Sequence, residues 1–117
     1  MNSISLKVGE RVIDFNFGLA FLGELLNKLG TSMSELSTEL TENPFRTIPT
    51  AMYTAAEAAA SRKGQKLDFD QAQFTDWLEE SGGLATDTVD DFLNAFMDSL
   101  LKNVPAEKAD PNSPKKK

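Results

Sequence analysis

The first seventeen residues alternate between apolar and polar side chains, which is the pattern of half-buried strands. Two such runs flank Gly9 and Glu10, and a two-residue loop that begins with glycine predicts a β-hairpin over residues 4–17. The register that this loop implies places five apolar residues on one face: Ile4, Leu6, Ile13, Phe15 and Phe17. Because an isolated hairpin is marginally stable in water, this face is expected to cover helices of the same chain or to join strands of another subunit.

The rest of the chain, up to residue 103, shows the 3.6-residue periodicity of amphipathic helices. The expected helices span about residues 18–29, 33–42, 48–63, 70–80 and 87–103. Gly30 ends the first helix, and the second must end before Pro44. The N-terminal caps expected for the later helices are Ser32 in a capping box with Glu35, Thr47 with Pro49 in the first turn, Asp68 or Asp70, and Thr86 or Asp87.

These elements predict an α+β fold that is mainly α: one globular domain over residues 1–103, with a short N-terminal hairpin followed by four or five helices. Residues 104–117 contain three prolines and no aromatic residue, so they are expected to form a disordered tail. The Ala-rich helix should bury Ile48, Met52, Ala55, Ala56 and Ala59.

Composition then removes most catalytic chemistry. The 117 residues include no histidine and no cysteine, which excludes histidine-dependent triads, thiolate nucleophiles and Cys/His zinc sites. Adjacent carboxylates such as Asp90 and Asp91 point about 100° apart on a helix and do not converge on one substrate atom. The sequence therefore predicts a protein that is not an enzyme, with no cofactor and no metal.

The net charge of −6 opposes binding to nucleic acid, and no apolar run approaches the roughly 18 residues of a membrane span. Nine carboxylates and no lysine or arginine lie between Asp68 and Asp98. These acids are interpreted in two ways. They form a surface for a basic partner or a mimic of nucleic-acid phosphates, or they are simply the solvated side of two helices.

A calcium loop is the other reading of this segment, because Asp68, Asp70 and Glu79 stand at its positions 1, 3 and 12. Position 5 is Ala72, and Gln73 stands where the loop requires glycine, so the sequence favours helix capping by Asp70 instead.

The apolar faces of the hairpin and the helices exceed what one small core is expected to use, which indicates a partner site. The expected site is a groove between the Ala-rich helix and the last helix, lined by Met52, Tyr53, Phe92, Phe96 and Met97. Self-association is expected through the hairpin, by Ile4, Leu6, Ile13 and Phe15, or through helix faces.

Over about residues 3 to 103 the chain resembles the tail assembly chaperones of long-tailed bacteriophages. The resemblance rests on layout and apolar spacing, in these segments: Ile4-Ser5-Leu6-Lys7-Val8, Phe15-Asn16-Phe17-Gly18 leading into residues 19–29, Pro49-x-x-Met52-Tyr53-x-Ala55-Ala56, Phe74-x-x-Trp77-Leu78-Glu79 and Val89-x-x-Phe92-Leu93-x-x-Phe96.

The resemblance implies a small helical protein that binds the tape measure protein in the host cytoplasm, keeps it soluble and helps to recruit tail tube subunits. It also implies that the protein is absent from the mature virion. Members of that family often have a longer, frameshifted form, and Lys115–Lys117 are consistent either with a slippery adenine run in the short form or with a solubilising tail only. Two rival functions stay open, an acidic interaction or nucleic-acid-mimic module and a structural tail or connector subunit.

Overall fold

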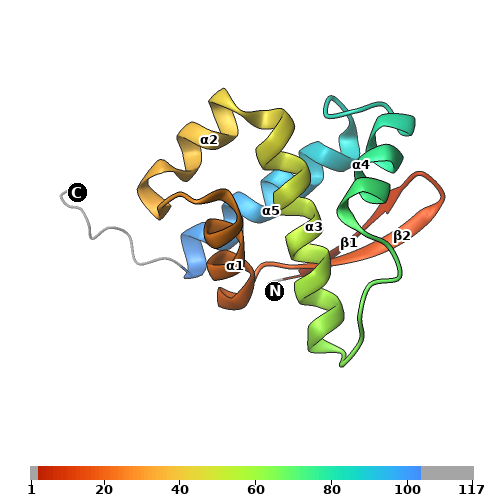
Figure 1. Ribbon diagram of the computed structural model, residues 1–117, viewed down its shortest axis with the longest axis horizontal. Helices are drawn as coiled ribbons and strands as arrows, with labels where there is room; N and C mark the ends of the chain where they lie inside the picture. Colours follow the sequence, from red (N-terminus) through yellow and green to blue (C-terminus); the bar gives the residue numbers. More distant parts are fainter. Residues whose placement is uncertain (1–2, 104–117) are drawn as a thin grey trace.

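The computed structural model describes residues 3–103 and has the predicted architecture, a hairpin followed by helices (Figure 1). Its elements are β1 (Ser3–Val8), β2 (Arg11–Asn16), α1 (Leu19–Leu29), a 3₁₀ turn η1 (Met33–Glu35), α2 (Leu36–Glu42), α3 (Pro44–Arg62), α4 (Gln71–Glu80) and α5 (Asp87–Asn103). The mainly helical α+β class is confirmed. The predicted tail, 104–117, lies outside the described residues.

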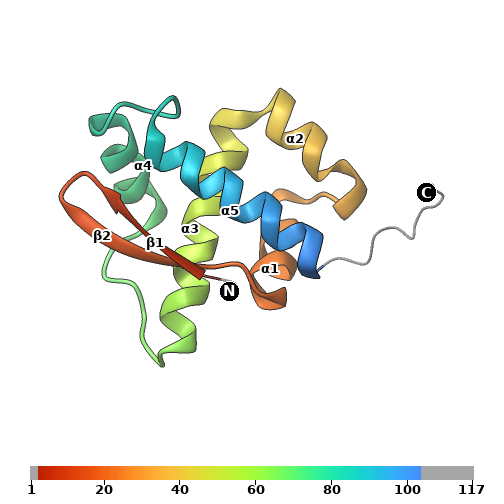
Figure 2. The same cartoon turned by 180° about the vertical axis from the view of Figure 1, so that it is seen from behind.

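The hairpin has the predicted register: Ile4 opposite Phe15, Leu6 opposite Ile13 and Val8 opposite Arg11. Gly9 has a φ angle of 64°, a conformation that glycine adopts without strain, as the two-residue loop requires. The strands pack against helices of the same chain, β2 against α3 and β1 against α5. Figure 2, which views the molecule from behind, shows α5 passing over the side of the fold on which β1 lies.

The centre of the core is a cluster of phenylalanines from the hairpin, α1 and α5: Phe15, Phe17, Phe21, Phe92 and Phe96. The rings of Phe15 and Phe92 meet edge-on with centroids 5.4 Å apart, and those of Phe21 and Phe96 do so at 5.3 Å. These contacts attach the hairpin and α1 to the last helix.

α3 runs through the middle of the fold and buries the five residues predicted for its inner face, from Ile48 to Ala59, which confirms that prediction. Ala51 is buried as well. Because most of these side chains are small, β2 and α1 can both approach the helix closely, and both pack against it.

A second, smaller cluster holds α4 against the hairpin loop. The Arg11 guanidinium lies 4.6 Å from the centre of the Trp77 ring and 5.3 Å from that of Phe69, and it pairs with Asp68 at 3.0 Å. The Tyr53 hydroxyl donates a hydrogen bond of 2.9 Å to the carbonyl of Phe69. Sequence periodicity gave no sign of this cluster, because its members come from four separate segments.

The predicted start of the third long helix is wrong. α3 begins at Pro44 instead of near Ile48, so Pro49 lies inside the helix and not in its first turn. Proline is favoured at the first helical position because its missing N–H is not needed there, and Pro44 fills that position. Thr47 is therefore an internal, buried residue whose hydroxyl donates to the carbonyl of Glu39 at 3.1 Å.

The predicted capping box at Ser32 is also wrong. The Ser32 hydroxyl pairs with that of Ser34 at 3.0 Å, while Glu35 accepts a hydrogen bond from Thr31 at 3.1 Å. Residues 33–35 form a 3₁₀ turn, so α2 begins at Leu36. Local hydrogen bonds between short polar side chains compete here with helix capping.

Other predicted helix ends are confirmed. Asp70 accepts a hydrogen bond of 2.8 Å from the backbone N–H of Gln73, whose own side chain completes a capping box. Thr86 accepts one of 3.3 Å from the N–H of Val89, and Gly30 ends α1 in the left-handed conformation.

Phe96→Ala and Met97→Ala are predicted to differ sharply although the residues are neighbours. Phe96 is fully buried among other rings, so its truncation should lower the free energy of unfolding by about 3–5 kcal/mol. Met97 is 48% exposed, and its truncation should cost less than about 1 kcal/mol. Urea unfolding followed by circular dichroism measures both values, and equal losses would contradict this description of α5.

Candidate apolar docking site

The expected client groove between the Ala-rich and last helices does not exist as predicted. Met52, Phe92 and Phe96 have no exposed surface. Rings of the hairpin and α1 pack against Phe92 and Phe96, and Met52 belongs to the same buried cluster. Tyr53 is half-buried, and its hydroxyl is engaged by Phe69. Only Met97 of the five predicted residues is exposed to a partner.

The face proposed for self-association is likewise used within the chain. Ile13 and Phe15 are buried, and Ile4 and Leu6 are half-buried against the same core. The alternative that the hairpin covers helices of its own chain is the one that the structure adopts, because α3 and α5 supply the apolar surface it needs.

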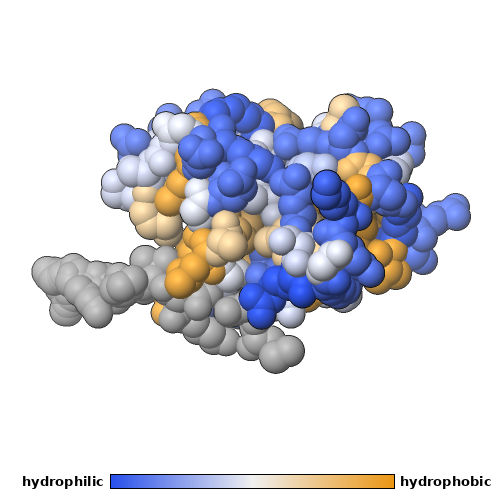
Figure 3. All heavy atoms as spheres, turned by 60° about the horizontal axis from the view of Figure 1, so that its bottom comes forward, coloured by the Kyte–Doolittle hydropathy of each residue, from blue (hydrophilic) through white to orange (hydrophobic). Residues whose placement is uncertain are grey.

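The surplus of apolar surface is consequently smaller than expected. Within residues 3–103 the exposed large apolar side chains are Val12, Leu19, Phe45, Met97 and Leu101. Figure 3 shows a face on which hydrophilic residues predominate and apolar residues form separate patches. An apolar partner site on this surface is therefore centred on individual exposed side chains.

Phe45 is the exposed residue that adjoins an apolar pocket. It is 83% exposed, and the pocket beside it has a volume of about 250 Å³. The pocket lies where α3 begins, between that helix, α4 and the segment that joins α4 to α5, and its lining residues are Phe45, Pro49, Thr75, Leu78, Glu79, Gly83 and Leu84. Leu78 is almost fully buried, whereas Glu79 is exposed.

The turn after α4 closes one side of this pocket. Gly82 and Gly83 have φ angles of 120° and 80°, which side chains rarely tolerate, and they reverse the chain so that Leu84 lies against the end of α4. The N–H of Gly83 donates to the carbonyl of Leu78 at 2.8 Å, which fixes the reversal.

Little of the pocket is polar. The Thr75 hydroxyl donates to the carbonyl of Gln71 at 2.9 Å, so it is satisfied within its own helix. Glu79 is the one ionisable residue of the lining. The pocket suits an apolar side chain of a partner, with one charged group at its border.

Phe45 is not among the predicted site residues, because the sequence pattern places it in a linker between two helices. The available signal was Pro44: at the first position of a helix, this proline fixes the following residue in the first turn.

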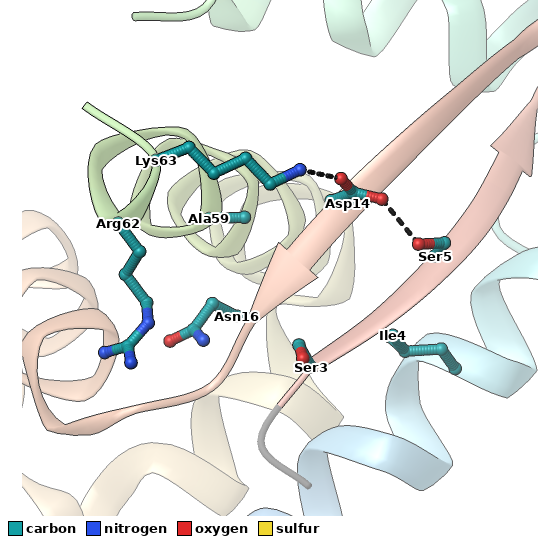
Figure 4. Close-up of a pocket in the computed structure, with 8 residues that line it drawn as sticks. All are labelled: Ser3, Ile4, Ser5, Asp14, Asn16, Ala59, Arg62 and Lys63. Atoms are coloured by element: carbon teal, nitrogen blue, oxygen red, sulfur yellow. Dashed lines mark hydrogen bonds and ion pairs between the residues drawn. The ribbon is translucent and has the colours of Figure 1, made fainter. Parts of the chain in front are cut away.

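The other hollow of interest is polar and lies between the hairpin and the end of α3 (Figure 4). There Lys63 pairs with the carboxylate of Asp14, which also accepts a hydrogen bond from Ser5. These hydrogen bonds, that of Lys63 first, lower the pKa of Asp14 below its ordinary value. The arrangement joins α3 to β2, and Arg62 stands at its border.

The carboxylates of α4 and α5 are spread over exposed positions. Asp68 pairs with Arg11 and Asp70 caps α4, but with the basic side chains that the structure describes no ion pair is formed by seven others: Asp76, Glu79, Glu80, Asp87, Asp90, Asp91 and Asp98. Within the described part of the chain, no group of three or more acidic residues is placed to hold a metal ion.

Comparison with known proteins gives no relative: no family model, no curated protein and no solved structure matches this chain. Among residues 3–103, none of the helices has the length and apolar character needed to cross a membrane.

Lys63→Met is predicted to destabilise the fold in a pH-dependent way. Because the pKa of Asp14 is lowered in the folded state, its ion pair contributes stability above about pH 4 and loses it as the pH falls through the folded pKa. The pair is exposed, so the loss at pH 7 should be about 0.2–1 kcal/mol. Urea unfolding at pH 7 and pH 2.5 tests this, and the same loss at both values would show that Lys63 acts by packing alone.

Proposed function

We propose that this protein is a non-enzymatic tail assembly chaperone of a long-tailed bacteriophage, which binds apolar helical segments of the tape measure protein. The observation that carries the proposal is Phe45, an aromatic side chain 83% exposed beside an apolar pocket. Exposed aromatic residues next to pockets are the usual anchors of protein–protein contacts. The layout that resembles this family, a hairpin followed by amphipathic helices, supports the same assignment.

The size of the site fits reversible binding of a helix. A pocket of about 250 Å³ accommodates one or two apolar side chains, such as those that a helix presents three or four residues apart. Burying Phe45 and one client side chain contributes roughly 1.5–3 kcal/mol for each residue. Such binding protects a client in the cytoplasm of the host and still allows its later release to the growing tail.

Two of the other exposed apolar residues form a separate surface. Met97 and Leu101 lie one turn apart on α5, and therefore on one side of that helix. In this proposal they contribute to association between copies of the chain or to recruitment of the tail tube protein. The acidic exterior keeps the loaded complex soluble, and the chaperone is absent from the mature virion.

Phe45→Ser is predicted to abolish solubilisation of a co-expressed tape measure protein without unfolding the chaperone, because the lost side chain is almost entirely outside the core. The matched control is Leu19→Ser, since Leu19 is 72% exposed on α1 and does not line this pocket. The measurement is the soluble fraction of the tape measure protein and its co-purification with each variant.

Equal loss in the two variants would contradict a site at Phe45, because it would indicate general surface hydrophobicity as the cause. Full solubilisation by Phe45→Ser would contradict it directly. Circular dichroism and the unfolding midpoint verify that each variant is folded.

One observation favours a second function, an acidic interaction module or nucleic-acid mimic: the seven carboxylates of α4 and α5 without an ion pair. The salt dependence of partner binding distinguishes these two functions. Binding through the apolar pocket should persist at 1 M salt, where the Debye length is about 3 Å, whereas a charge mimic should lose its partner. A structural tail or connector subunit, the third possibility, would be found in purified particles.

A further inference from the structure

The border of the Phe45 pocket is acidic. Glu79 lines the pocket, and Asp76 and Glu80 are exposed on the same helix three residues before it and one residue after it. None of these three carboxylates forms an ion pair with a lysine or arginine whose side chain the structure describes. Among residues 3–101, no basic side chain contributes to the pocket lining.

The basic residue next to Phe45 in the sequence is engaged by other parts of the fold. Arg46 follows Phe45 directly, but its guanidinium donates to the carbonyl of Leu29 at 2.9 Å and lies 3.5 Å from the carboxylate of Glu39. Arg46 therefore joins α3 to α1 and α2 and is not placed to neutralise Glu79.

The position of these acids in α4 is locally unfavourable. Glu79 and Glu80 are the last two residues of the helix, where the backbone carbonyls carry partial negative charge, and no basic residue is present in this last turn. Positions that violate a local rule without a compensating contact are often functional. A cationic partner would supply the missing compensation.

We propose that the occupant of the Phe45 pocket is an amphipathic helix that carries lysine or arginine beside its apolar anchor. The anchor enters the pocket next to Phe45 and Leu78, and the basic side chain, one helical turn along the partner, pairs with Glu79. This inference rests on the proposed function and specifies the chemistry of the client segment. Because the pocket itself is apolar, the partner needs an apolar anchor and cannot bind there through ionic contacts alone.

The test uses two synthetic amphipathic helical peptides that share one apolar stripe and differ only in having lysine or glutamine beside it. Their binding to the full-length protein is measured by isothermal titration calorimetry at low and high salt. The lysine peptide should bind about three- to ten-fold more tightly at low salt, and high salt should reduce this preference, because the ion pair is exposed.

Glu79→Gln should remove most of this preference, and Glu79→Lys should transfer it to a matching peptide with glutamate in place of lysine. Glu24→Gln is the matched control, since Glu24 is an exposed acid on α1, outside the pocket. Glu79→Gln should also raise the unfolding midpoint slightly, because it removes a charge that repels the end of α4. A purely structural role of Glu79 would instead lower that midpoint.

The outcomes distinguish this inference from the proposed function. Equal binding of both peptides to the wild-type protein would overturn the cationic client and leave the apolar site intact. An unchanged lysine preference in Glu79→Gln would overturn the role of Glu79. Failure of both peptides to bind, or binding to Phe45→Ser as tight as to the wild-type protein, would overturn the proposed function together with the inference.

Discussion

The fold depends on aromatic contacts between segments that lie far apart in the chain. A two-stranded hairpin does not persist alone in water, and here Phe15 and Phe17 gain their burial from Phe92 and Phe96 of the last helix. The hairpin and α5 therefore require each other. α3 packs against both β2 and α1, and its small side chains determine how closely these two elements approach it.

Burial of these apolar faces determines which apolar side chains remain exposed and able to bind a partner. The inward stripes of the helices are consumed by the core, so the exterior is mostly charged and acidic. The pocket at Phe45 exists because α3 starts one turn before the residues that the core needs, and this extra turn carries an aromatic side chain beyond the edge of the core. The area of this pocket is small, which is compatible with the transient binding proposed for it.

Periodicity and the loop at Gly9 were sufficient to predict the hairpin register, a series of four or five helices and the inner face of α3, because each depends on residues close in sequence. It failed for the groove, since a stripe on α5 shows which side is apolar but not what covers it, and Phe15 and Phe21 proved to be what covers Phe92 and Phe96. The contact between Arg11 and Trp77 escaped prediction because it joins residues remote in sequence. The sequence identifies the acids of α4 as a group. It does not show that Glu79 differs from the others in lining the Phe45 pocket, which only the structure reveals.

Pro49 has a consequence for how the Phe45 side chain is held in place. Proline has no N–H, so the backbone hydrogen bond that would link residue 49 to the carbonyl of Phe45 cannot form. The opening turn of α3 therefore lacks one backbone hydrogen bond to the rest of the helix. Side chains replace it: Arg46 donates to the carbonyl of Leu29 and Thr47 to that of Glu39. The place of the exposed Phe45 ring is thus set by contacts with neighbouring helices and not by the backbone of α3 alone.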